Sequence, residues 1–141
     1  MKYGTARHRP DGEWVQFEAL LKVAGVQYRK ENVRQWAEAV RNAEAANAHY
    51  GVELSRNRWN WFDPNAIKVL GVASGQRWFI GYVPAPVARD ITNELYKQNL
   101  PVSAELYSIY QSHDFYDVNI LILAPPGQSR KARDNRHAGP R

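Results

Sequence analysis

The sequence predicts a mainly β domain with two helices, folded as a small, partly closed β-barrel of about six strands. Short apolar runs, several of them alternating with polar residues, are separated by turn residues along most of the chain. Two other segments repeat their apolar residues with helical spacing. With 141 residues and a hydrophobic content of 44%, the chain is long enough to bury one core.

The first expected strand, Phe17–Val26, is apolar with some alternation. The other five expected strands are short and lie at 52–56, 66–70, 79–83, 102–109 and 118–123. The sequence Ala73-Ser74-Gly75 predicts a hairpin turn between two of them. Because helices interrupt the strands at only two connections, the pattern favours a barrel over a parallel βαβ sheet.

The first helix is expected at Val33–Tyr50. Its apolar side chains fall on one stripe, at Trp36, Val40, Ala43 and Tyr50. Asn32 is placed to cap the start of the helix, and Gly51 is placed to end it in the left-handed conformation.

The second helix is expected from Pro86 to Gln98, because proline is favoured at the first helical position. Its buried side would carry Val87, Ile91 and Leu95. The sequence Asn99-Leu100-Pro101 should stop it.

The chain lacks the sequence signals of membrane, secreted and common catalytic proteins. No run of 18 apolar residues exists, and Met1–Pro10 has no apolar centre, so we expect neither a membrane span nor a secretory signal. The absence of cysteine suits a reducing cytoplasm. There is no P-loop and no Gly-x-Ser-x-Gly motif, and the four histidines are scattered. We therefore expect no enzyme activity, no cofactor and no metal site.

The net charge of +5 is concentrated in the two ends of the chain. Residues 1–12 carry +2 and are expected to form a flexible basic arm. Residues 125–141 carry +4 and almost no apolar side chains, so we expect a disordered basic tail. The predicted barrel domain, 13–124, carries −1, and any broad attraction to phosphates is therefore expected from the ends.

The segment from Arg56 to Asp63 concentrates residue types that bind nucleic acids. It contains two arginines, three large aromatic side chains, two asparagines and one carboxylate. Aromatic faces stack on bases, and guanidinium groups pair with phosphates. The alternative is that the aromatic residues fill the core and that Asp63-Pro64-Asn65 forms a turn with no binding role.

Three blocks of sequence resemble the HIRAN family. They are Val23-Ala24-Gly25-Val26-Gln27-Tyr28, then Leu54-x-Arg56 with Asn60-x-Phe62-Asp63-x-Asn65-Ala66-Ile67-x-Val69, then Ile80-Gly81-Tyr82-Val83-Pro84. The resemblance covers residues 17–123 and implies that the barrel is OB-like and that the first block is a strand. It also implies a module that recognises single-stranded DNA at a free 3′ end, in DNA repair, with a helicase or nuclease as partner protein.

The resemblance assigns roles to individual residues. Tyr28 corresponds to an aromatic residue that meets the terminal nucleotide, and Phe62 to a tyrosine that stacks on a base. Asp63 corresponds to a carboxylate that accepts a hydrogen bond from the 3′-hydroxyl, and Tyr82 to a DNA-contacting histidine. The candidate site comprises Tyr28, Arg56, Arg58, Asn60, Trp61, Phe62, Asp63 and Tyr82.

The loop also departs from the family pattern. Asn57-Arg58 replaces an acidic residue and a proline, Trp61 replaces a proline, and Phe62 replaces the tyrosine. These changes make the loop more basic and more aromatic.

Two further functions stay open. The 33–50 helix could dock a nucleic-acid-processing enzyme, which would make the chain a protein-interaction module. Alternatively, Asp114 and Asp117, with His113 nearby, could bind a metal ion in a nuclease. Salt-dependent binding of oligonucleotides would favour the DNA-binding module, whereas magnesium-dependent cleavage would indicate the nuclease.

Overall fold

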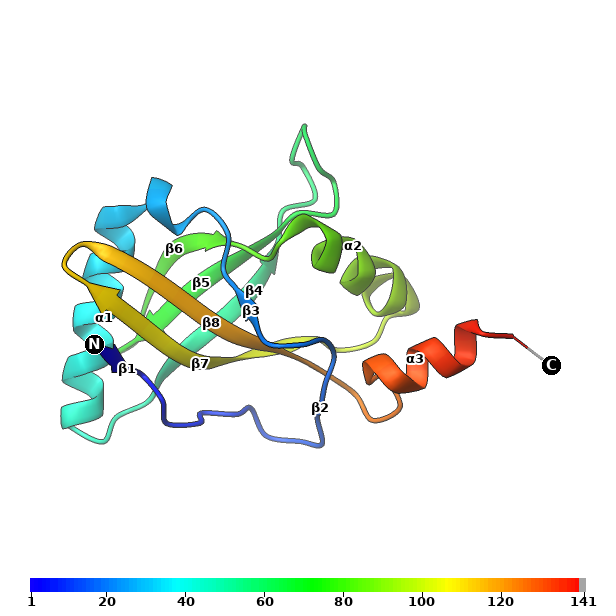
Figure 1. The fold of residues 1–141 in the computed structure, drawn as a ribbon, viewed down its shortest axis with the longest axis horizontal. Coiled ribbons are helices and arrows are strands. Elements are labelled where there is room, and N and C mark those ends of the chain that lie inside the picture. Colours follow the sequence, from blue (N-terminus) through cyan, green and yellow to red (C-terminus); the bar gives the residue numbers. More distant parts are fainter. Residues whose placement is uncertain (140–141) are drawn as a thin grey trace.

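The computed structural model describes residues 1–139, which form two antiparallel sheets, three α-helices and two short 3-10 helices (Figure 1). The prediction of a mainly β chain is confirmed. The predicted number of two helices is wrong, because a third helix lies in the C-terminal segment.

The larger sheet has the order β1-β7-β8-β2, and β3 also pairs with β8. Its strands are β1 (Lys2–Tyr3), β2 (Val15–Gln16), β3 (Leu21–Lys22), β7 (Ser103–Ser112) and β8 (Phe115–Ala124). The single strand predicted at Phe17–Val26 is wrong, since the chain pairs with β8 as two short strands. Between them Phe17 is fully buried and its amide donates to the Ile122 carbonyl at 2.8 Å.

The smaller sheet contains β4 (Tyr50–Arg56), β5 (Ile67–Ala73) and β6 (Gln76–Tyr82) in chain order. Ser74 and Gly75 join β5 to β6 with φ angles of 52° and 74°. Two central residues with positive φ are typical of the tight turns that match strand twist. The predicted hairpin turn is therefore confirmed.

The core contains apolar side chains from both sheets, from the helices and from the segments that flank them. The largest fully buried apolar side chains are Phe17, Trp36, Tyr50, Ile67, Ile80, Ile91, Leu95, Ile109, Ile120, Ile122 and Leu123. The strand ladders of the described residues do not join the two sheets into a closed cylinder. The partly closed barrel of about six strands is thus not confirmed, and residues 1–139 contain eight strands.

Helix α1 (Lys30–Ala45) begins and ends earlier than predicted. Asn32 lies within the helix, and its side-chain amide donates to the Phe79 carbonyl at 2.9 Å, so the predicted cap is wrong. Gly51 belongs to β4, because its neighbour Tyr50 is buried and pairs with Ala73. Sheet pairing and burial at Tyr50 thus override the helical spacing that included this residue.

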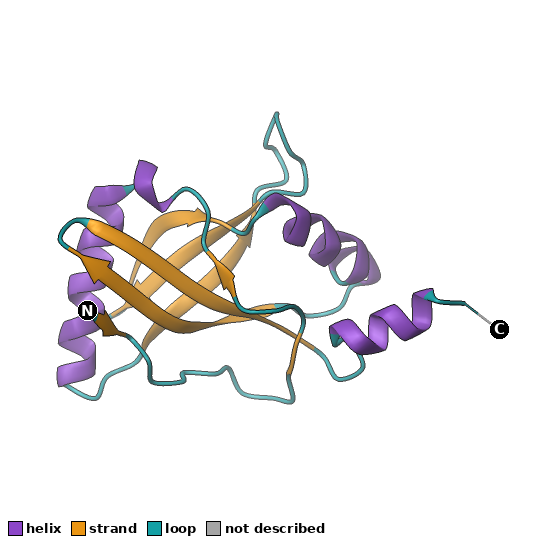
Figure 2. Cartoon of the chain, viewed as in Figure 1, coloured by secondary structure: helices purple, strands orange, loops and turns teal. Residues whose placement is uncertain are grey.

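Helix α2 (Ala85–Glu94) continues into a short 3-10 helix, η2 (Tyr96–Gln98). Asn99 ends the segment in the left-handed conformation, with φ of 56°, so the predicted stop is confirmed. In Figure 2, α1 lies on the left of the strands, and α2 and α3 lie on the right. Within residues 1–139 no helix combines the length and the apolar character needed to cross a membrane.

Neither end of the chain is as free as predicted. In the arm, Tyr3 is buried in β1, and the Arg9 Nε lies 2.8 Å from a carboxylate oxygen of the buried Glu105. In the tail, residues 130–137 form helix α3 (Arg130–His137), whose start is capped by the Ser129 hydroxyl. Over these residues the structure therefore differs from the predicted flexible arm and disordered tail, and residues 140–141 of the predicted tail lie outside the described residues.

Candidate nucleic-acid interface

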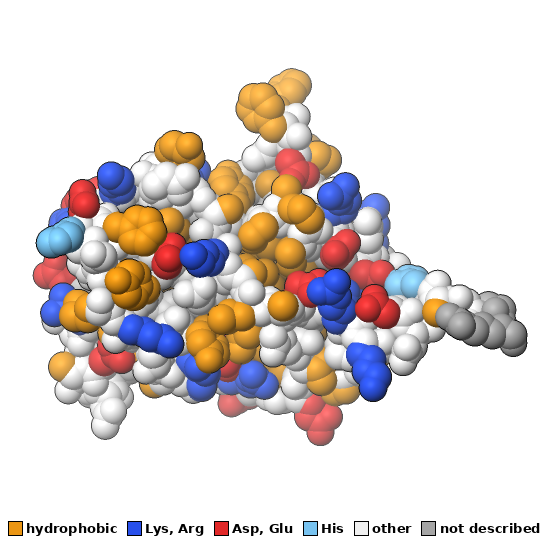
Figure 3. Space-filling model, viewed as in Figure 1, with side chains coloured by type: hydrophobic (Ala, Val, Ile, Leu, Met, Phe, Trp, Pro, Cys, Tyr) orange, Lys and Arg blue, Asp and Glu red, His pale blue; other side chains and the backbone are white. Residues whose placement is uncertain are grey.

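The loop between β4 and β5, residues 57–66, projects beyond the rest of the fold (Figure 1). Its three large aromatic side chains are almost completely exposed: Trp59 is 91% exposed, Trp61 97% and Phe62 99%. Apolar side chains accordingly stand at the tip of the projection at the top of Figure 3. The alternative that these rings fill the core is wrong.

Hydrogen bonds from within the loop fix its shape. The Asn60 side-chain oxygen accepts from the amides of Phe62 at 2.8 Å and Asp63 at 3.0 Å. One Asp63 carboxylate oxygen accepts from the Asn65 amide at 2.9 Å. Asn and Asp favour turns through such bonds. Asn60 thus shapes the loop, and Asp63 keeps its second oxygen, Oδ2, without a hydrogen bond within residues 1–139.

Tyr82, at the end of β6, connects the loop to the segment before α1. Its backbone exchanges two hydrogen bonds of 2.8 Å with Ala24, and its hydroxyl accepts from the Asn57 side chain at 3.3 Å. The Arg29 guanidinium carbon lies 5.2 Å from the centre of the Tyr82 ring. Tyr82 therefore lies at the base of the loop, and its contact with DNA stays a prediction.

Arg56 lies on the other side of the loop base. It pairs with Ile67, whose side chain is fully buried, whereas Tyr82 pairs with the next residue, Lys68. Successive strand residues face opposite sides of a sheet, so Arg56 and Tyr82 lie on opposite faces of the smaller sheet. The Arg56 guanidinium instead lies 4.4 Å from the Tyr96 ring centre. Burial raises the pKa of Tyr96, and Arg56 acts in the opposite direction.

Tyr28 is not part of a strand, and the strand implied for 23–28 is wrong. Only Ala24 forms a β-bridge, and Val26–Tyr28 is a 3-10 helix, η1. The Tyr28 ring is 81% exposed and makes no ring contact with the loop. The next residue, Arg29, reaches the β6 aromatic rings instead.

The cations around the loop are unneutralised. Arg29, Arg56, Arg58 and Lys68 form no ion pair with a carboxylate in the part of the chain that the structure describes. Asp63 is the one acidic residue in the loop itself. An electropositive surface with exposed rings is what a single nucleic-acid strand requires.

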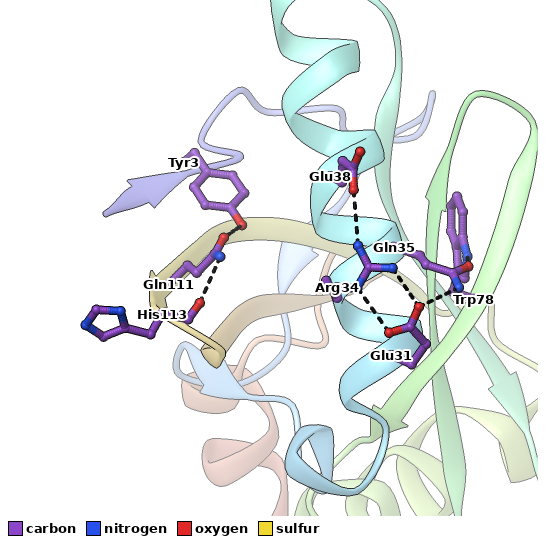
Figure 4. Close-up of polar contacts among 8 residues, drawn as sticks. All are labelled: Tyr3, Glu31, Arg34, Gln35, Glu38, Trp78, Gln111 and His113. Atoms are coloured by element: carbon purple, nitrogen blue, oxygen red, sulfur yellow. Dashed lines mark hydrogen bonds and ion pairs between the residues drawn. The ribbon is translucent and has the colours of Figure 1, made fainter.

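Helix α1 turns most of its apolar side chains toward the core, which leaves little apolar surface for docking a partner. Its apolar side chains Val33, Trp36, Ala37, Val40 and Ala43 are buried in the core. Its outer side is polar, and Figure 4 shows Arg34 bound to Glu31 and Glu38. The hydrogen bonds to Arg34 and Gln35 lower the pKa of Glu31 to about 2. A partner enzyme would therefore have to bind this charged side.

The acidic pair near the β7–β8 turn is not grouped with further metal ligands. Asp117 forms an ion pair of 3.1 Å with Lys22. No set of three or more His, Asp or Glu side chains that could hold a metal ion occurs within residues 1–139. The nuclease hypothesis thus has no assembled ligand set behind it.

No family model matches this chain, and the comparisons with curated proteins and with solved structures found no match either. The HIRAN resemblance and the functions that it implies therefore stay predictions.

The structure adds Arg29, Lys68 and Phe79 to the residues near the loop, and the sequence reasoning missed them. Alternation along 66–70 could have identified Lys68 as outward-facing. Alternation along 79–83 would place Phe79 on the face opposite Tyr82, and the register shift in the β5–β6 pairing puts the two rings on one face instead. No sequence pattern indicates that Arg29 would reach β6.

Proposed function

We propose that this chain is a binding module for single-stranded DNA, that it holds a free 3′ end, and that the loop 57–66 is its principal contact. The observation that carries the proposal is the near-complete exposure of Trp59, Trp61 and Phe62 on one projecting loop. Burying one large apolar side chain stabilises a protein by about 1.5–3 kcal/mol, and these three side chains do not contribute that free energy to the fold. Stacking on bases would recover that energy.

The charges beside the loop support a nucleic acid over an apolar partner. Arg56 and Arg58 lie on or next to the loop, and neither forms an ion pair with a carboxylate within residues 1–139. Cations that flank stacking rings bind the backbone of a single strand while the rings hold its bases.

Asp63 supports the choice of a strand end. Its free oxygen, Oδ2, can accept a hydrogen bond from a terminal hydroxyl, and its charge repels the phosphate of a continuing strand. The proposal includes membership of the HIRAN family, an opened OB-like arrangement in which β4 lies beside β7, and a helicase or nuclease as partner protein.

The test compares 3′-hydroxyl and 3′-phosphate oligonucleotides. The hydroxyl end should bind more tightly by at least about 1.5–3 kcal/mol, the value of a charge-assisted hydrogen bond. Asp63→Asn should reduce this difference in affinity, because it removes the repulsion between the carboxylate and the 3′-phosphate. The side-chain oxygen of the introduced asparagine can still accept a hydrogen bond from the Asn65 amide. Fluorescence anisotropy measures both affinities.

The control is Asp114→Asn on the remote β7–β8 turn, which should leave this difference in affinity unchanged. Equal binding of the two ends by the unmodified protein would contradict end recognition. A parallel shift for both ends in Asp63→Asn would mean that Asp63 serves the turn alone.

A further inference from the structure

The smaller sheet has one face that is only half covered. Along β5, Ile67, Val69, Gly71 and Ala73 are buried, whereas Lys68, Leu70 and Val72 are half-exposed. Directly paired residues share a face of the sheet. Lys68 pairs with Ser55 and Tyr82, and Leu70 pairs with Glu53 and Phe79. We call this half-exposed side, from Lys68 to Val72 with its partners, the outer face.

Two cations are held against aromatic rings on the outer face. The Arg29 guanidinium carbon lies 4.1 Å from the Phe79 ring centre, and the Lys68 Nζ lies 5.0 Å from it. Phe79 in turn meets Tyr82 edge to face, with ring centres 5.3 Å apart. A cation over a ring is restrained without being neutralised. Arg29 and Lys68 therefore stay available to an anion and lose little freedom on binding it.

The free positive charge is confined to the end of the outer face near the loop. At the opposite end Arg77 is neutralised by Glu53, with N–O distances of 2.8 and 3.1 Å. Near the loop, Asn57 donates to Tyr82, so the cations adjoin the first loop residue. From the Lys68–Tyr82 row to the Val72–Arg77 row the face extends ~13 Å, at about 3.3 Å per residue.

We propose that the outer face carries a phosphate track, in which Arg29 and Lys68 bind the phosphodiester backbone of the strand whose end the loop holds. The track rests on the proposed function, because the loop must bring the strand to the face. The track predicts that Arg29 and Lys68 contribute to the affinity only when the strand is long enough to extend beyond the loop. Arg77 and Glu53 mark where the track ends.

The test compares a trinucleotide with a decanucleotide, both carrying a free 3′-hydroxyl, for Arg29→Ala and Lys68→Ala. For the decanucleotide, each variant should reduce the slope of log K against log salt by about 0.7, the value for one phosphate contact on a single strand. The trinucleotide should bind both variants as it binds the unmodified protein. Lys2→Ala is the matched control, since Lys2 lies over the Tyr107 ring in the other sheet.

Unchanged slopes for the decanucleotide in both variants, with melting temperatures preserved, would overturn the track and leave loop binding intact. Equal weakening of the trinucleotide would also overturn it, because the cations would then act at the strand end. If the unmodified protein binds neither oligonucleotide, the proposed function itself fails, and the track fails with it.

Discussion

At the scale of single residues, Asp63 combines a structural and a binding property in one side chain. Its Oδ1 organises the turn through the Asn65 amide, and its Oδ2 has no hydrogen-bond partner within residues 1–139. The sequence posed these two roles as alternatives. The geometry makes them compatible, since each role uses a different oxygen.

Gly81 is the residue on which the junction of β6 with the 23–24 segment depends. A Cβ at this position would lie 2.4 Å from the Ala24 carbonyl oxygen and 2.6 Å from a Val23 methyl carbon. Gly81→Ala should therefore destabilise the fold by about 1–3 kcal/mol, as overpacking does. Chemical denaturation measures this change.

Gly51→Ala is the control, because a Cβ at Gly51 would meet no other atom within 4 Å and the substitution should be nearly neutral. Full stability of Gly81→Ala would show that the 23–24 segment is not held against β6. Since that segment leads to Arg29, such a result would also detach Arg29 from the ring of Tyr82.

The sequence identified the candidate loop better than it identified the surroundings of the loop. Clustered arginines and aromatic residues at 56–63 predicted an interface, and the exposure of Trp61 and Phe62 agrees with it. The neighbourhoods of Arg56 and Arg29 could not be predicted, because their rings come from Tyr96 and Phe79, which are distant in the sequence. Such contacts depend on tertiary packing and leave no local pattern.

At the scale of elements, α3 shows why composition misjudged the tail. A segment with almost no apolar side chains was expected to stay disordered. Instead, the guanidinium carbon of Arg133 lies 3.6 Å from the centre of the Phe17 ring, and its guanidinium donates a hydrogen bond to the Phe17 carbonyl. Ion pairs from Arg130 to Glu18 and from Arg136 to Glu94 add to this docking. The buried side chain of Arg133 thus holds α3 against the fold, as an apolar side chain would in another helix.

Arg133→Ala should consequently lower the free energy of unfolding by about 2 kcal/mol, through loss of a cation–π contact and a charged hydrogen bond. Thermal melting of the full chain checks this, with the exposed Lys131→Ala as control. If Arg133→Ala melts like the unmodified protein, the contacts of Arg133 with Phe17 contribute nothing to the stability of the fold.

At the scale of the whole molecule, ion pairs neutralise part of the positive charge that the sequence places at the two ends of the chain. In the arm Arg9 is paired with Glu105, and in the tail Arg130 and Arg136 are paired with Glu18 and Glu94. The four cations near the loop are free of carboxylates in the described chain. Electrostatic attraction of a strand should thus be directed to the loop and the outer face.

The central claim, that the loop 57–66 binds single strands by stacking, is tested most directly by one pair of variants in an oligonucleotide titration. Phe62→Ala should weaken binding by about 1–3 kcal/mol, the value of one stacked base. Its melting temperature should not change, because the side chain is 99% exposed. Phe115→Ala removes a half-exposed phenylalanine from β8 and should leave the affinity unchanged. Full affinity in Phe62→Ala, or an equal loss in Phe115→Ala, would contradict the account.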